Sequence, residues 1–594
     1  MKSLQHLNKY FLKYKWLLLL GIAFTFISNL FGILPAQIVR QSLDIVLDTV
    51  DLYFLFNNFS YQNSFYGIFS WTLALFGALL LLMAALKGLF LFFVRQTLIV
   101  MSRKIEFDLK NEIYAHYQSL PLSFFRKNNT GDLMARISED VGKVRMYVGP
   151  SIMYGINLIS VFFLVFGYMF STNTKLAFFV LLPVPFLSLS IFIVNSIIMK
   201  KSEIIQAQLS SIATFTQEAF SGIRVVKSFV KEKSSLIAFT KQSDDYRSKS
   251  LSMVRVDALY TPLVAVLAGM SSILVVYVGG LEVMAGRFTI GNITEFLMYV
   301  YMLTWPMIAL GWTSSQINRA AVSQRRINEF LNFKNNIISF GNIKKTIIGD
   351  ISLKNISLQY PDTGIVAIKD LSLTIKKGEC IAILGTTGSG KSSIANLICR
   401  LYDTTSGEIT IDGLSIKEYD VNFLRGNIGY VTQDVFLFSD TILNNVKFGS
   451  SQYSDEDCIK ALKIADLYDS VMTFKDGVNT VLGERGITLS GGQKQRLSIA
   501  RAVVRKPTVL IFDDCLSAVD TKTEHKILSN LSILMQNSTT FIFSHRISSA
   551  KYAKNILILD NGMVVENGNH EKLMNKQGTY FTMYNQQMTE NIND

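Results

Sequence analysis

Gly385-Thr386-Thr387-Gly388-Ser389-Gly390-Lys391-Ser392 has the composition and spacing of a phosphate-binding loop. The apolar run Ile381–Leu384 before it indicates a buried strand, and the loop is expected to open a helix that continues through Leu401. Glycines let successive backbone N–H groups point at phosphate oxygens, and the helix N-terminus adds positive potential. Lys391 is expected to reach the β- and γ-phosphates, and Ser392 to bind Mg²⁺. The stretch therefore predicts a strand–loop–helix unit that binds phosphates.

A second glycine-rich segment lies farther along the chain. Leu489-Ser490-Gly491-Gly492-Gln493 precedes a helix-like run, Leu497–Ala502. Ser490 and the two glycines are expected to present N–H groups and a helix N-terminus to phosphate. With this segment the chain resembles the ATP-binding cassette (ABC) family, whose signature it matches. The resemblance implies that the signature contacts ATP held by the opposite subunit, so that a complete site needs two chains.

Two acidic residues, Asp513 and Asp514, follow the apolar run Val509–Phe512. A continuous apolar run is typical of a strand in a parallel sheet, and α/β proteins place their ligand sites at the carboxyl ends of such strands. The resemblance implies that Asp513 holds Mg²⁺ through water and that Asp514 occupies the position of the general base. Most hydrolytically competent cassettes have glutamate there, and aspartate is one methylene shorter.

Polar residues after two other expected strands match the same family. Gln433 follows Gly429–Thr432 and matches the glutamine that senses Mg²⁺ and the attacking water. His545 follows Phe541–Ser544 and matches the histidine that contacts the γ-phosphate. Tyr360 resembles the aromatic residue that stacks on adenine, an interaction that recognises a flat base without reading its edges.

The resemblance thus implies a full set of site residues. Those expected to bind ATP are Tyr360, Gly385, Thr386, Thr387, Gly388, Ser389, Gly390, Lys391, Ser392, Ser393, Ser490, Gly491, Gly492 and Gln493. Those expected to hold Mg²⁺ are Ser392, Gln433 and Asp513, and the expected catalytic residues are Asp514, His545, Gln433 and Lys391. Two further segments match the family: Ser517–Asp520, expected to touch the partner across the dimer interface, and Gly483-Glu484-Arg485-Gly486, expected to relay motion to the membrane domain.

The first half of the chain is rich in apolar runs of membrane length. The chain has 594 residues, 49% of them hydrophobic, and its mean hydropathy of +0.30 is too high for an ordinary soluble protein. A membrane span needs about 20 predominantly apolar residues. The runs predicted to span the bilayer are Trp16–Ile38, Phe69–Phe93, Met153–Phe170, Leu176–Ile198, Ala258–Gly279 and Ile293–Leu310.

Basic residues predict the orientation of these spans. Lysines precede the first span, and the long segments Arg95–Arg145 and Lys200–Arg255 carry many more basic residues, whereas the loop after the first span is acidic. Both termini and the cassette are therefore expected in the cytoplasm, with the chain in the inner (cytoplasmic) membrane. This arrangement accounts for part of the net charge of +13 more simply than a nucleic-acid partner would, and none is expected.

Both long basic segments also resemble the intracellular loops of ABC exporters. The first contains Leu120–Phe125 and Thr130–Leu133, and the second contains Gly222–Phe229. The resemblance implies extended helices that end in short coupling helices, the second of which crosses to the partner's cassette. The expected domains are residues 1–317 for the transmembrane part with its coupling loops, 318–349 for a linker and 350–594 for the cassette. The expected fold class is six transmembrane helices of exporter type fused to an α/β P-loop ATP-binding cassette.

The resemblance is closest to bacterial lipid A and multidrug exporters. It implies a half-transporter that acts as a dimer and uses ATP hydrolysis to export or flip an amphipathic lipid or drug-like substrate. An importer built on the exporter fold, as for siderophores, and an ATP-gated channel are the alternatives. Asp514 either marks the impaired site of a heterodimer or serves as the base of a homodimer. The unaltered Gln433, His545 and phosphate loop favour the homodimer.

Overall fold

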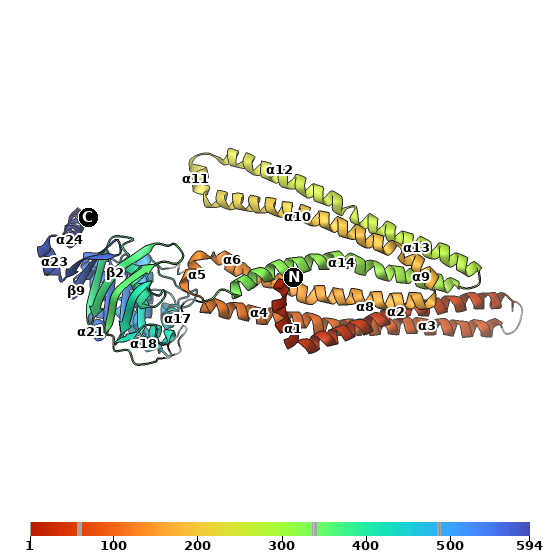
Figure 1. The fold of residues 1–594 in the computed structure, drawn as a ribbon, viewed down its shortest axis with the longest axis horizontal. Coiled ribbons are helices and arrows are strands. Elements are labelled where there is room, and N and C mark those ends of the chain that lie inside the picture. The colour runs from red at the N-terminus through yellow and green to blue at the C-terminus, as the bar shows by residue number, and fades with distance from the viewer. Residues whose placement is uncertain are drawn as a thin grey trace. The chain divides into compact units, whose positions relative to one another are not determined.

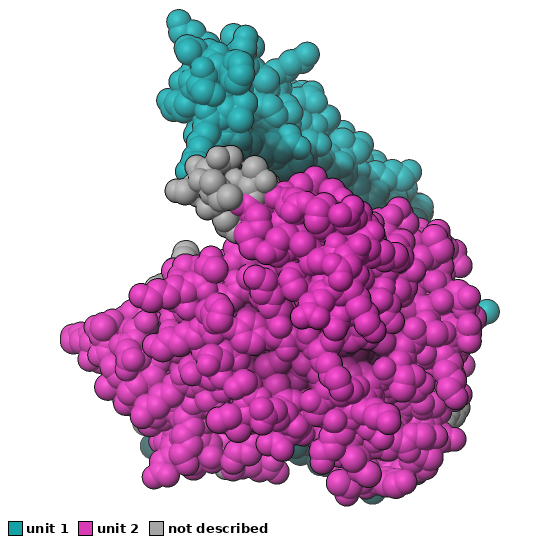
Figure 2. Space-filling model, turned by 90° about the vertical axis from the view of Figure 1, so that its left-hand side faces the viewer, with its two compact units in different colours: residues 1–118, 131–333 teal, residues 119–130, 334–594 magenta. Residues whose placement is uncertain are grey.

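The computed structural model describes residues 2–55, 62–335, 337, 341, 343–448, 450, 452–483, 486 and 489–593. The chain divides into two compact units, residues 1–118 with 131–333 and residues 119–130 with 334–594 (Figure 2). The first unit is built of helices, and strands β1–β10 all belong to the second (Figure 1). Glu484 and Arg485 of the segment expected to relay motion lie outside the described residues.

Long apolar helices make up the first unit. Among the described residues, five stretches are long and apolar enough to cross a membrane, and they contain five of the six predicted spans. The remaining predicted span, Leu176–Ile198, is divided between two helices that meet at Leu182. The second helix begins at Pro183, because proline is tolerated at the first position of a helix, where its missing N–H group would have no partner anyway. The five stretches are Lys15–Val50, Tyr66–Ser119, Thr130–Thr172, Glu232–Met284 and Ile290–Leu331.

Several helices of this unit follow one another with only short breaks. Three of the segments are π-helical turns, η2, η3 and η4, and they join α-helices without a loop. In chain order the elements are η1 Lys2–Leu7, α1 Asn8–Lys13, α2 Lys15–Leu55, α3 Gln62–Val94, η2 Arg95–Ile99, α4 Val100–Ser119, α6 Thr130–Ala135, η3 Arg136–Asp140, α7 Val141–Met146, η4 Tyr147–Ser151, α8 Ile152–Thr172, α9 Thr174–Leu181, α10 Pro183–Ser221, α11 Ile223–Ser228, α12 Glu232–Asp257, α13 Tyr260–Met284 and α14 Ile290–Leu331.

The last helix of the unit, α14, continues beyond the expected end of the transmembrane domain. Ile327 and Phe330 in its final turns are buried, and this packing favours continuation of the helix to Leu331. Residues 318–331 of the expected linker are therefore helical. The domain bounds given above remain predictions.

The second unit contains two β-sheets. The four-stranded sheet has the order β2-β1-β4-β5 and is antiparallel. The six-stranded sheet has the order β10-β9-β3-β8-β7-β6, with parallel pairing except between β9 and β10. The strands are β1 Ile351–Gln359, β2 Val366–Ile375, β3 Cys380–Gly385, β4 Ser406–Ile411, β5 Leu414–Ser415, β6 Ile428–Val431, β7 Val509–Asp513, β8 Thr539–Ser544, β9 Asn555–Asp560 and β10 Met563–Gly568.

The three strands β3, β7 and β8 are buried along their whole length. Their side chains alternate between hydrophobic clusters: Ile381 and Ile383 enter one, and Ala382 and Leu384 another. A strand covered on both faces is predominantly apolar, which explains the apolar runs Ile381–Leu384 and Val509–Phe512 in the sequence.

Helices pack around these sheets (Figure 1). The helix after the phosphate loop, α15, ends at Ile398 and not at Leu401, because Arg400 has the left-handed φ of +48°, which interrupts a helix. The helical segments of the unit are α5 Leu122–Lys127, α15 Lys391–Ile398, α16 Val421–Gly426, α17 Ile442–Lys447, α18 Asp455–Ile464, α19 Tyr468–Met472, η5 Gly477–Asn479, α20 Gly491–Val503, α21 Thr521–Asn537, α22 Ile547–Ala550, α23 His570–Lys576 and α24 Thr579–Asn593.

Candidate nucleotide site

The phosphate loop runs from the carboxyl end of β3 to the start of α15. Gly388 and Gly390 have φ values of +86° and +106°, a region that favours glycine. A Cβ atom on Gly390 would lie 2.4 Å from the carbonyl oxygen of Ala367, and one on Gly385 would lie 2.2 Å from that of Leu559. The loop therefore needs glycine at these positions for conformation and for close backbone packing.

Lys391 lies over the loop that it follows. Its Nζ donates hydrogen bonds to the carbonyl oxygens of Gly385 (2.7 Å) and Thr386 (2.8 Å). Desolvation lowers the pKa of Lys391, and the nearby charges of Asp514 and Asp513 oppose this shift. The ammonium group is thus held at the loop, where it can interact with phosphate oxygens. Thr386 and Thr387 are exposed on the same loop, and Ser389 is buried beneath it.

Asp513, the last residue of β7, is buried beside the start of α15. It accepts hydrogen bonds from Ser392 Oγ (3.0 Å) and from the hydroxyl of Tyr430 (3.2 Å). Burial raises the pKa of Asp513, while the two hydrogen bonds oppose the rise. Tyr430 was not predicted as a site residue; its place in β6 before Gln433 gives no sign of this contact.

The chemistry of this pair fits Mg²⁺. In the described part of the chain, no group of three or more His, Cys, Asp or Glu side chains could hold a metal ion. Ser392 and Asp513 provide two oxygen atoms on neighbouring elements. Mg²⁺ in nucleotide sites is commonly bound by one or two protein oxygens, with water and phosphate oxygens completing the shell.

Asp514 contacts two other residues that are expected to be catalytic, His545 and Gln433. Its Oδ1 lies 2.9 Å from His545 Nδ1, and its Oδ2 accepts a hydrogen bond of 3.5 Å from Gln433 Nε2. Its backbone has the left-handed φ of +48°, which aspartate tolerates better than most residues, and its N–H donates to the carbonyl of Phe543 at 2.8 Å. Side chains that follow β6, β7 and β8 therefore meet at one edge of the parallel sheet.

Tyr360 follows β1 and lies close to α15. Its hydroxyl shares a hydrogen bond of 2.8 Å with Ser393 Oγ, and its ring meets that of Tyr402 edge to face. The guanidinium carbon of Arg126, on α5, lies 5.2 Å from the centre of the Tyr360 ring. The sequence pattern did not predict this contact, because Arg126 and Tyr360 lie far apart in the chain.

The signature segment Leu489–Gln493 forms the start of α20. Ser490 is the N-cap: its Oγ accepts from Gln493 N (3.3 Å), and Gln493 Oε1 accepts from Ser490 N (2.9 Å). Among the hydrogen bonds of the described residues, none joins Ser490, Gly491, Gly492 or Gln493 to the phosphate loop. The structure of one chain thus leaves the two expected phosphate-binding segments without a direct hydrogen bond.

The signature helix is bonded instead to the segment Ser517–Asp520. Gln495 donates to Ser517 Oγ (3.2 Å) and accepts from the N–H of Ala518 (3.0 Å). Ser517 Oγ also donates to the carbonyl of Asp514 at 2.9 Å. These bonds connect α20 to the backbone of Asp514.

Arg546, next to His545, also donates hydrogen bonds to the segment Ser517–Asp520. It donates to the carbonyls of Ser517 (2.6 Å) and Val519 (3.1 Å) and lies 3.4 Å from the buried Glu524. Glu524 also accepts hydrogen bonds from Ser548 and Ser549. Arg546 and Gln495 adjoin predicted motifs in the sequence, whereas nothing in the sequence pattern singled out Glu524.

Together these features define a membrane protein with a helical membrane unit and a P-loop nucleotide-binding unit in one chain. Comparison with known families agrees: residues 18–307 match the ABC transporter transmembrane region, and residues 368–517 match the ABC transporter domain. The chain belongs to the ABC transporter family and is an ATPase that couples hydrolysis to transport.

Curated relatives cover most of the chain. YknU of Bacillus subtilis, an uncharacterized ABC transporter ATP-binding protein, is 35% identical over 84% of this chain and 86% of its own length. YheI of the same organism, a probable multidrug resistance ABC transporter ATP-binding/permease protein, is 33% identical over 81% and 82%. The multidrug resistance-like ATP-binding protein MdlA of Buchnera aphidicola is 31% identical over 99% and 98%.

Proposed function

We propose that the chain uses ATP hydrolysis to export amphipathic compounds, drug-like molecules or lipids, from the cytoplasmic side of the inner membrane. Two features found in one chain support this proposal. The chain has apolar helices of membrane length, and Lys391, Asp513, Asp514 and His545 lie at the carboxyl ends of the parallel strands. Relatives named for multidrug resistance support drug-like substrates. The basic cytoplasmic segments support a cytoplasmic cassette.

A cavity in the helical unit supports an amphipathic substrate. It lies between α8 and α14 and has a volume of about 290 Å³. Tyr154, Leu158 and Leu310 contribute apolar surface, whereas Thr313 and Asn318 contribute polar atoms. An apolar cavity with a few polar groups suits a ligand that has both characters.

We further propose that the working unit is a dimer. Lys391 and Asp514 act on ATP that also contacts Ser490 of a facing chain, as the signature does in the family to which the chain belongs. The hairpin of α10 and α12 supports this arrangement (Figure 1). Near its tip, at α11, Phe220, Phe229 and Val230 are 73%, 70% and 80% exposed. Such an apolar surface is typical of an interaction site, and we propose that it packs on the partner's cassette.

In the proposed cycle, two bound ATP molecules close the paired cassettes, and the coupling helices transmit this movement to the membrane spans. Lys391 stabilises negative charge on the transferring phosphoryl group, and Asp514 acts as the general base toward water. Ser392 and Asp513, with Gln433, would hold Mg²⁺, which when bound neutralises charge on the β- and γ-phosphates. Hydrolysis and release of phosphate reset the transporter.

Two compositions of the dimer are compatible with Asp514. We infer a homodimer, because Asp514 lies within hydrogen-bonding distance of both Gln433 and His545, although its side chain is short. In a heterodimer, the second chain would supply a glutamate at this position and Asp514 would mark an impaired site. Purification of the native complex through a tag on this chain, followed by mass measurement of its subunits, distinguishes the two: one kind of subunit supports the homodimer, and a second half-transporter contradicts it.

The direction of transport is tested in proteoliposomes that contain the native complex with cassettes facing outward. Added ATP should drive accumulation of an amphipathic fluorescent dye inside the vesicles. Release of preloaded dye on ATP addition would show an importer, and ion conductance without dye movement would show an ATP-gated channel. Either of these results would contradict the proposed export.

A further inference from the structure

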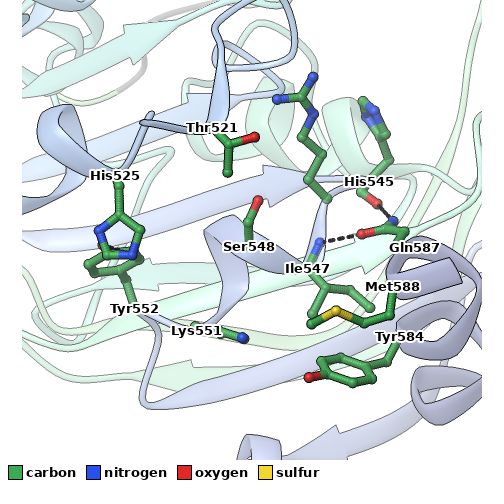
Figure 3. A pocket seen from close by; sticks show the side chains of 11 residues that line it. Thr521, His525, His545, Ile547, Ser548, Lys551, Tyr552, Tyr584, Gln587 and Met588 are labelled. Carbon is green, nitrogen blue, oxygen red and sulfur yellow. Dashed lines mark hydrogen bonds between the residues drawn. The ribbon is translucent and has the colours of Figure 1, made fainter. Parts of the chain in front are cut away.

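The C-terminal helix α24 reaches the backbone on both sides of Arg546. The side chain of Gln587 donates from Nε2 to the carbonyl oxygen of His545 (2.6 Å) and accepts at Oε1 from the N–H of Ile547 (2.9 Å). Figure 3 shows these two bonds side by side, with the amide group of Gln587 directed at the segment. One side chain thus satisfies two backbone groups in the segment that carries His545.

The position of Gln587 is fixed by the other end of its helix. Tyr580, near the start of α24, is fully buried in a cluster with Ile547. The carboxylate of Glu566 accepts hydrogen bonds from the N–H groups of Thr579 (2.7 Å) and Tyr580 (3.1 Å), which satisfies two of the free donors at the start of the helix. Tyr580 and Gln587 are seven residues apart, so they lie on one face of the helix. Burial of the first residue therefore directs the second at the His545 segment.

One side of the segment borders an open cavity. A cavity of about 640 Å³ is lined by His545, Ile547 and Gln587, together with residues of α21, α22 and α24 (Figure 3). Backbone whose hydrogen bonds face solvent opens locally at lower free energy than backbone in a packed core. The two bonds from Gln587 restrain the segment on this side.

We propose that Gln587 is a positioning residue for ATP hydrolysis, which holds the backbone of His545 so that its imidazole stays against Asp514. The same two bonds bracket Arg546, whose guanidinium fixes the carbonyl of Ser517. The C-terminal helix is thereby part of the catalytic geometry through the backbone of His545. This inference rests on the proposed roles of His545 and Asp514 in hydrolysis.

The test compares Gln587→Met with Gln586→Met in the purified native complex. Methionine has nearly the length of glutamine but makes neither bond, and Gln586 is the exposed neighbour on the same helix. Gln587→Met should lower kcat for ATP about 10-fold, because misplacement of a catalytic group by about 1 Å costs up to about 10²-fold. The KM for ATP should change less than about 2-fold, because the phosphate loop is untouched. Gln586→Met should leave both constants unchanged.

A mutant cycle with His545→Ala separates positioning from general stabilisation. His545→Ala alone should lower turnover by about 10²-fold. Adding Gln587→Met to it should cause almost no further loss, since there is no imidazole left to position. An equal loss in both backgrounds would overturn the positioning role and leave the proposed function intact, whereas normal turnover of His545→Ala would overturn the role of His545 and the inference with it.

Hydrogen exchange gives a second measurement that does not depend on activity. The amide of Ile547 should exchange about 5-fold faster or more in Gln587→Met, because its hydrogen bond is lost, and should be unchanged in Gln586→Met. Unchanged exchange at Ile547 in Gln587→Met would overturn the inference.

Discussion

His545 Nδ1 lies 2.9 Å from Oδ1 of Asp514, so the imidazole is held by the carboxylate that stands in the position of the general base. Asp514 Oδ2 accepts a hydrogen bond from Gln433 as well. Although the side chain of Asp514 is one methylene shorter than the glutamate common in cassettes, its carboxylate still contacts both His545 and Gln433.

Replacement of Asp514 by asparagine keeps the shape of the side chain and removes its charge. We expect Asp514→Asn to lower ATP turnover of the chain purified alone by about 10²-fold, because the variant lacks the proposed general base, while ATP binding is retained. Asp476→Asn, at an exposed position, serves as the control. If the lone chain is inactive but gains turnover with a second half-transporter, and this turnover does not depend on Asp514, the homodimer is wrong.

Gly491 should tolerate an added side chain better than Gly492 does, as far as folding is concerned. A Cβ atom on Gly491 would lie 3.6 Å from Cβ of Ala518, an ordinary contact, whereas one on Gly492 would lie 2.9 Å from the carbonyl oxygen of Ala518. Gly491→Asp should therefore leave folding intact but abolish ATP-driven closure, because it adds negative charge where we expect phosphate to bind.

Crosslinking of the paired cassettes with and without ATP measures closure, and thermal unfolding measures folding. Gly492→Ala should lower the unfolding temperature more than Gly491→Ala does. An ATP-dependent closed dimer formed by Gly491→Asp would refute the expectation for the signature.

Arg546 should contribute to stability through the segment Ser517–Asp520. Arg546→Met removes its hydrogen bonds to Ser517 and Val519 and leaves the buried Glu524 without its cation. We expect a loss of about 1–3 kcal/mol, because buried acceptors lose partners. Lys551→Met, whose lysine lines the same cavity, is the matched control, and both are measured by thermal unfolding of the purified chain. Equal unfolding temperatures for the two variants would count against this role.

The cassette cysteines should be inert in the folded protein. Burial raises the pKa of Cys380 and of Cys399 to about 12, from an ordinary value of about 9. At pH 8 N-ethylmaleimide should modify neither until the cassette is unfolded, and a cysteine introduced at the exposed Lys417 should react at once.

The same pKa values set a pH dependence of stability. The raised folded pKa means that the thiols contribute stability that is fully present below about pH 9 and is lost as the pH rises toward about 12, because the unfolded chain releases these protons first. Thermal unfolding between pH 8 and pH 11 should show a falling midpoint. Rapid modification of Cys399 in the folded protein would contradict this description of the core.

Local sequence patterns were sufficient to predict two buried strands and the phosphate loop. Strands β3 and β7 are buried on both faces, so their apolar runs predicted them, and the phosphate loop requires glycines at fixed spacing. The family resemblance placed Asp513, Asp514 and His545 after strands, and the parallel order of the sheet brings the three to one edge.

Other contacts of the site depend on packing between distant segments. Gln587, Arg126 and Glu524 are ordinary polar residues in the sequence, and no periodicity shows which backbone or ring they will meet. The predicted end of the helix after the phosphate loop was wrong, because α15 ends at Ile398, shortly before the left-handed Arg400. The continuation of α14 to Leu331 is stabilised by the burial of Ile327 and Phe330. These outcomes are decided by tertiary packing, which overrides local propensity.

ATP bound at this chain's own phosphate loop is expected to drive transport, and ATP turnover of the native complex in proteoliposomes tests this directly. Lys391 Nζ lies over the loop, bonded to two of its carbonyls, and it should stabilise charge in the transition state. Lys391→Ala should therefore lower turnover by at least about 10²-fold and stop dye accumulation, with normal membrane insertion, while Lys417→Ala changes neither. Unchanged ATP turnover in Lys391→Ala would show that ATP at this phosphate loop does not drive transport.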